Sequence, residues 1–137
     1  MDKPLPGLPM EEIFAMARQA LADSPLPFFY YGRALTWAIA KYYMTPIEED
    51  GELIAPYTRL FHKPAVKDCL HPFGCYVEYE SVFGFKYVGL FLCVWMGTLC
   101  NQDPSGYIIM DIRTSIVKHV PEVKFLTTER PPDPSSY

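Results

Sequence analysis

The side chains best suited to chemistry in this sequence are thiols and imidazoles. Cys69, Cys75, Cys93 and Cys100 contain no CxxC pair, and three of them lie in or beside apolar runs. A free thiol in such a run behaves as a small hydrophobic group. The spacing therefore predicts buried thiols, with the histidines at the surface.

Zinc binding is the alternative for part of this set. His62, Cys69, His71 and Cys75 supply four nitrogen and sulfur ligands, the number that zinc takes in a tetrahedral site. Structural zinc sites pair their ligands more tightly along the chain, commonly as C-x₂₋₄-C. We therefore expect these residues to bind no metal.

Two acidic features could also bind a cation. Glu48, Glu49 and Asp50 are consecutive, and consecutive loop residues rarely converge on one ion without further ligands. Residues 47–52 are more simply a solvated connector. Asp111 ends a predicted strand beside a turn, where a carboxylate usually accepts a local backbone hydrogen bond. The sequence assigns no metal ligand and no cofactor-binding residue.

Catalysis would need a general base beside a nucleophile, and His62, His71 and His119 are the candidate bases. Nothing in the sequence brings one of them to a particular serine or cysteine. We find no motif with a stated catalytic mechanism. We expect no catalytic residue, no small-molecule substrate and no enzyme, and a small enzyme with a Cys or His centre is the open alternative.

The charge balance bears on partners and location. The chain has 12 basic and 16 acidic residues, and its basic residues occur singly. Nucleic-acid binding depends on clustered Lys and Arg, so we expect weak DNA association at best. The N-terminal residues do not resemble a signal peptide, and the longest apolar run falls short of the roughly 20 residues that span a bilayer. We expect an intracellular protein, with the nucleus as a candidate location, and no membrane contact.

Residues 70–111 are the stretch around which the other elements must be arranged. Residues 73–79 alternate with the period of a half-buried strand. Residues 88–96 are apolar throughout apart from Gly89, which predicts a central strand buried on both faces. The remaining signals are turn formers at 101–106 and short strands at 107–112, 116–120 and 123–126. Turns at this spacing are typical of a small barrel.

Two helices are predicted before these strands. Apolar residues spaced three and four apart predict a helix of about three turns that follows Pro9, and Pro25 and Pro27 end it. Residues 28–44 repeat with the helical period and carry aromatic side chains on more than one face. Residues 55–61 predict a short helix or turn. The fold class is α+β, with two N-terminal helices followed by a small antiparallel β-barrel.

An ordered set of motifs covers residues 10–129 and comprises LPFFYYGRALTWAIAKYYMTP, APYTRLFHKP, LHPFGCYVEY, GLFLC and GYIIMD. In this order, the set resembles the integrase region of copia-type LTR retrotransposon polyproteins. The matching residues are Leu26, Pro27, Tyr30, Tyr31, Gly32, Ala34, Ala38, Pro46, Ala55, Pro56, Tyr57, Leu70, Phe73, Gly74, Cys75, Gly89, Leu90, Phe91, Leu92, Gly106, Tyr107, Ile109, Asp111, Val123 and Phe125.

The resemblance implies a division of the chain. Residues 10–66 are expected to be a helical remnant of the RNase H-like integrase core, and residues 67–129 an SH3-like β-barrel. Residues 1–9 and 130–137 are rich in proline and are expected to be disordered.

The same resemblance implies that integrase chemistry is missing. That chemistry needs three carboxylates that hold two divalent metals. The family's last acid precedes the segment matched here by residues 16–18, and the corresponding position is Gly7. The two earlier acids would lie before Met1. In the family, a segment with basic residues leads into the second strand. Residues 81–85 stand in its place here and lack two of its cations.

The sequence therefore predicts a non-catalytic fragment of a copia-type retrotransposon Pol polyprotein, related to DNA integration only through its parent element. Its expected partner is the missing integrase core or another protein. The alternative is a standalone SH3-like protein-interaction module.

Overall fold

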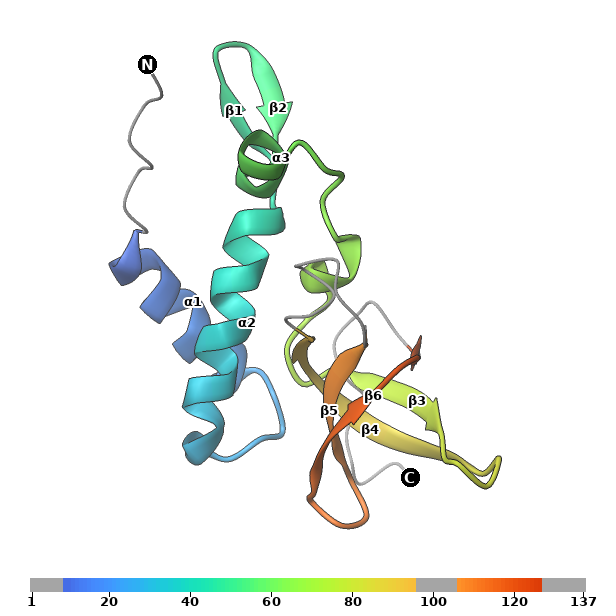
Figure 1. The fold of residues 1–137 in the computed structure, drawn as a ribbon. Helices are drawn as coiled ribbons and strands as arrows, with labels where there is room; N and C mark the ends of the chain where they lie inside the picture. The colour runs from blue at the N-terminus through green and yellow to red at the C-terminus, as the bar shows by residue number, and fades with distance from the viewer. Residues whose placement is uncertain (1–8, 96–105, 127–137) are drawn as a thin grey trace.

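The computed structural model describes residues 9–95 and 106–126 of the chain. Helices come first, then a small hairpin and a short helix, and last a five-stranded sheet (Figure 1). The predicted turn at 101–106 and the disorder predicted for 1–9 and 130–137 fall outside these residues, apart from Pro9 and Gly106. Cys100 also lies outside them.

Both predicted long helices are present. Helix α1 (Met10–Ala22) buries Ile13, Ala17 and Leu21 along one stripe. The second helical segment begins with a 3₁₀ turn, η1 (Phe28–Tyr30), and continues as α2 (Tyr31–Met44). The prediction of one continuous helix over 28–44 therefore needs correction at its first turn.

The acidic connector is a hairpin where the sequence predicted a loop. Strands β1 (Ile47–Glu49) and β2 (Glu52–Ile54) pair antiparallel around Asp50 and Gly51, both of which have positive φ. With positive φ at both central residues, the Asp-Gly turn matches the right-handed twist of the two strands that it joins. All three residues of β1 are exposed, so the expectation of a solvated segment holds.

Two further elements lead into the sheet. Helix α3 (Pro56–Phe61) confirms the short helix predicted at 55–61, and a 3₁₀ turn, η2 (Lys67–Leu70), follows it. The first strand of the sheet, β3 (Tyr76–Glu80), begins three residues later than predicted. The cause is Gly74, whose φ of +79° places residues 72–75 in a turn.

The sheet is antiparallel throughout. Its strands are β3, β4 (Lys86–Val94), β5 (Tyr107–Asp111), β6 (Val117–Val120) and β7 (Lys124–Phe125), in the order β6-β5-β4-β3-β7. Strand β4 is central, and its last six residues are buried. The central strand predicted at 88–96 is confirmed from Val88 to Val94, although β4 begins two residues earlier and ends before Trp95.

The sheet is strongly curled. Tyr107 on β5 and Phe125 on β7 lie three strands apart, and a flat sheet would hold their Cα atoms at least about 14 Å apart. Their ring centroids are only 6.1 Å apart. Lys118 on β6 likewise reaches the ring of Tyr79 on β3, at 5.6 Å. Hydrogen bonding between β6 and β7, which would close a barrel, is not observed in the described residues.

The helices pack against the sheet and share one hydrophobic core with it. Helix α2 packs against β4, and the indole N–H of Trp37 donates a hydrogen bond of 2.8 Å to the carbonyl of His71. Buried side chains from α1, α2 and the sheet form one continuous cluster. The division of the chain into a helical region at 10–66 and a barrel at 67–129 remains a prediction. Within the described part of the chain, no helix is both long and apolar enough to cross a membrane.

Candidate functional site

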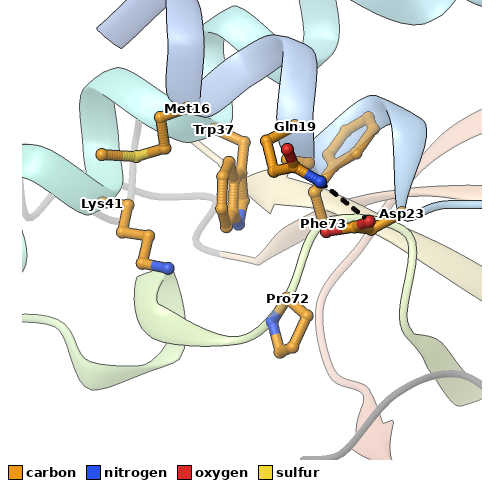
Figure 2. Close-up of a pocket in the computed structure, with 8 residues that line it drawn as sticks. Met16, Gln19, Asp23, Trp37, Lys41, Pro72 and Phe73 are labelled. Atoms are coloured by element: carbon orange, nitrogen blue, oxygen red, sulfur yellow. Dashed lines mark hydrogen bonds between the residues drawn. The ribbon is translucent and has the colours of Figure 1, made fainter. Parts of the chain in front are cut away.

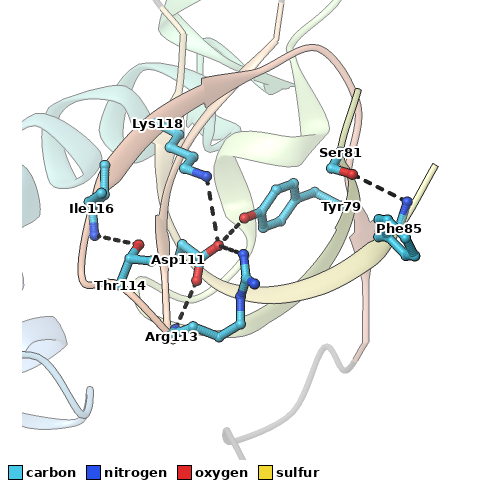
Figure 3. A network of polar contacts seen from close by, with 8 residues as sticks. All are labelled: Tyr79, Ser81, Phe85, Asp111, Arg113, Thr114, Ile116 and Lys118. Carbon is cyan, nitrogen blue, oxygen red and sulfur yellow. Dashed lines mark hydrogen bonds and ion pairs between the residues drawn. The ribbon is translucent and has the colours of Figure 1, made fainter. Parts of the chain in front are cut away.

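A buried aspartate is the centre of the main polar cluster inside the curled sheet. Asp111, at the end of β5, is fully buried and meets Tyr79 from β3, Arg113 from the following turn and Lys118 from β6 (Figure 3). These four residues are called the aspartate cluster below. Strand pairing brings them together, because Asp111 and Tyr79 lie on the same face two strands apart.

The carboxylate of Asp111 is well satisfied. Its Oδ1 accepts the backbone N–H of Arg113 at 2.8 Å, which confirms the predicted local backbone contact. Its Oδ2 accepts from the Arg113 guanidinium at 3.0 Å and from the Tyr79 hydroxyl, and it lies 3.8 Å from the Lys118 ammonium. The guanidinium also stacks on the ring of Tyr87, 3.4 Å from its centroid. Of these contacts, the sequence predicted only the local hydrogen bond from a backbone N–H to the Asp111 carboxylate.

Burial and hydrogen bonding act in opposite directions on this carboxylate. Burial disfavours the charged form, but the hydrogen bonds from Arg113 and Tyr79 outweigh it and lower the pKa of Asp111 to about 2. Burial, together with the neighbouring carboxylate, raises the pKa of Tyr79. At neutral pH the cluster therefore holds an ionised aspartate, a neutral phenol and two cations. This arrangement fixes β3, β5 and β6 relative to one another.

Acid should weaken the fold through Asp111. Because the folded pKa of about 2 is below the ordinary value of 3.8, its contribution is present above pH 4 and is lost as the pH falls toward 2. We expect a loss of about 2 kcal/mol over that range. Urea unfolding of the wild type and Asp111→Asn from pH 6 to pH 2.5 measures it. A stability difference that does not shrink on acidification would contradict the assignment.

The cysteines that the structure describes are buried, as expected. Burial raises the pKa of the Cys69 and Cys75 thiols to about 12, and that of the Cys93 thiol to about 11. The thiolate is the nucleophile and the metal ligand, so these groups are poorly suited to either role at neutral pH.

Among the described residues, the histidines do not join the thiols in a metal-binding group. The imidazole of His71 stacks on Phe125, with ring centroids 3.6 Å apart, and so helps to cover the end of the sheet. His62 occupies a left-handed position just after α3. In residues 9–95 and 106–126, no three His, Cys, Asp or Glu side chains gather closely enough to hold a metal ion. Glu49 of the acidic hairpin instead pairs with Arg59 at 3.5 Å.

An open groove of about 660 Å³ lies between α1, α2 and the turn before β3 (Figure 2). Trp37 and Phe73, both nearly fully buried, form its floor. The full lining is Met16, Gln19, Ala20, Asp23, Trp37, Lys41, Pro72 and Phe73. We call it the Trp37 groove. Sequence reasoning had placed Trp37 on an apolar helix but gave no sign of a groove beside it.

Comparison with known proteins gives no relative for this chain: no protein family, no curated protein and no solved structure matches it.

Proposed function

We propose that this chain is the closing part of a copia-type integrase region, without catalytic activity of its own, and that its sheet is an SH3-like barrel. The pairing of β7 with β3 carries the proposal, because it places the last strand of the sheet beside the first. Such a return is needed to close a small five-stranded barrel. The curl that brings Tyr107 to Phe125 supports the same architecture.

The proposed role is protein binding, with the rest of the integrase as the partner, inside the cell. The chain carries a net charge of −4, which disfavours a phosphate backbone as its main partner. Arg113 and Lys118 are partly neutralised, since both pair with the buried carboxylate of Asp111. These two cations of the curled sheet are thus engaged within the fold.

DNA binding should accordingly be weak. We expect a dissociation constant above about 1 µM for a 30-base-pair duplex at physiological salt, with further weakening as salt is raised. Fluorescence anisotropy at two salt concentrations measures it. A sub-micromolar affinity at physiological salt would overturn this part of the proposal.

Strand transfer tests the lack of activity directly. The chain, incubated with a labelled DNA end, a target duplex and Mg²⁺ or Mn²⁺, is expected to give no joined product, because integrase chemistry needs three carboxylates around two metals. An active integrase in the same buffer is the positive control. Joined product that disappears on chelation would show a metal centre and refute the proposal.

Exposed aromatic side chains favour a second candidate, a standalone protein-interaction module. Phe28 and Phe29, in the 3₁₀ turn before α2, are 78% and 80% exposed. Large exposed apolar side chains that lie together commonly mark a surface that meets another protein. In this alternative the same fold works outside a retrotransposon, and only the neighbouring coding sequence separates the two candidates.

A further inference from the structure

The turn between β3 and β4 presents apolar side chains to solvent. Val82, Phe83 and Phe85 are 94%, 83% and 62% exposed. Residues 81–85 are called the hairpin tip below. Turns of this kind usually carry polar residues or glycine, so three large apolar side chains within four positions are unusual.

The hairpin tip is held in one shape by hydrogen bonds. The amide of Ser81 donates to the carbonyl of Phe85 at 2.7 Å, and the amide of Gly84 donates to the carbonyl of Ser81 at 3.0 Å. The Ser81 hydroxyl oxygen accepts from the amide of Phe83 at 3.3 Å. It also accepts from the amide of Phe85 at 3.2 Å (Figure 3). A preorganised apolar projection loses little conformational entropy on binding.

The same molecule has a site that such a projection could enter. The Trp37 groove has an aromatic floor, and Met16 on its wall is a flexible side chain that adapts to an aromatic guest. Its volume of about 660 Å³ leaves room for the side chains of Val82 and Phe83. The β3–β4 hairpin points away from the helices that form the groove, so the tip of one molecule cannot fill its own groove (Figure 1).

Charges at the two places are complementary. At the base of the hairpin tip, Glu80 on β3 stands directly opposite Lys86 on β4. At the groove, Lys41 and Asp23 lie on opposite sides of Trp37 (Figure 2). In one orientation of a hairpin that entered the groove, Glu80 would face Lys41, and Lys86, which lies 3.9 Å from Glu78 in its own sheet, would face Asp23. Such pairing selects an orientation more than it adds affinity.

We propose that the hairpin tip of one copy of this chain binds the Trp37 groove of a second copy. The tip and the groove are different surfaces, so the contact is heterologous and can extend beyond a pair unless it closes. The buried area is small, and we expect self-association with a dissociation constant roughly between 10 and 100 µM. This inference goes beyond the proposed function and does not depend on it.

Sedimentation velocity across a concentration series tests the contact. The wild type should show a weight-average sedimentation coefficient that rises with concentration. Val82→Ser/Phe83→Ser should weaken association at least about tenfold, because it removes two apolar anchors. Leu53→Ser, at another largely exposed apolar position on β2, is the control and should leave association unchanged. A wild type that stays monomeric to about 1 mM, or a tip variant that associates like the wild type, would overturn the proposal.

A charge exchange tests the groove itself. Glu80→Lys and Lys41→Glu should each weaken association about fivefold, and the double variant should recover most of the loss. Both side chains are at least partly exposed, so the fold should persist, which unfolding in urea verifies. A double variant that associates no better than either single variant would show that the tip of one copy does not meet the groove of the other.

Discussion

Replacing Phe91 with alanine should lower the free energy of unfolding by about 3–5 kcal/mol. Phe91 is fully buried on the central strand β4, and its ring meets that of Phe125 edge to face, with centroids 5.1 Å apart. Truncation removes the packing that holds β7 against the inside of the curled sheet and leaves a cavity there. Urea unfolding followed by circular dichroism measures the loss.

The matched control for this variant is Phe83→Ala, which removes the same atoms from a side chain that is 83% exposed. We expect it to change stability by less than about 0.5 kcal/mol. If the two variants lost similar stability, Phe91 would not be the packing centre of the sheet. Hydrogen exchange adds a local readout, since the amides of β7 should lose protection in Phe91→Ala first.

Replacing Trp37 with alanine should also destabilise the fold by about 3–5 kcal/mol. Trp37 is 4% exposed, its ring lies 6.1 Å from that of Phe73, and its N–H donates to the carbonyl of His71. Trp37→Phe keeps most of the apolar packing but removes the donor, so it should lose only about 1–3 kcal/mol. The difference between the two variants separates packing from the hydrogen bond.

Cooperativity provides the second readout for Trp37. Because the helices and the sheet share one core, far-ultraviolet helix signal and near-ultraviolet aromatic signal should shift to lower urea together in Trp37→Ala. Thr36→Ala, at the exposed neighbouring position on α2, should change stability by less than about 0.5 kcal/mol. Helical signal that is lost while the sheet stays folded would contradict a single unit.

Part of the fold could be predicted because its signals are local. The apolar run of β4 is long, and only burial on both faces accommodates it, so its central place followed from the sequence. The Asp50-Gly51 hairpin was also within reach, since an Asp-Gly pair favours the turn of a two-residue hairpin. The three consecutive acidic residues, Glu48, Glu49 and Asp50, favoured the interpretation of this segment as a loop.

The start of β3 was predicted too early, because the apolar alternation begins before the strand does. Phe73 and Cys75 are buried and fit the alternation of the strand, but they belong to a turn. Gly74 is the cause, because a side chain there would meet the Cβ of Ser24 at 2.7 Å and its φ is positive. The helical segment and the sheet approach closely at this point, and only Gly74 itself hinted at that contact.

The polar cluster and the groove needed the structure. Asp111 and Tyr79 are 32 residues apart, and their contact depends on strand register and on the curl of the sheet. The Trp37 groove depends on how α1, α2 and the turn at Pro72 meet. Neither is a property of one segment, so local periodicity could not place them.

Long-read sequencing of the transcript that carries this coding sequence tests the central claim most directly. If the chain is the closing part of a copia-type integrase region, the same transcript should continue downstream into sequence that encodes a reverse transcriptase. A transcript that encodes this fold alone, with no Pol sequence on either side, would contradict the claim.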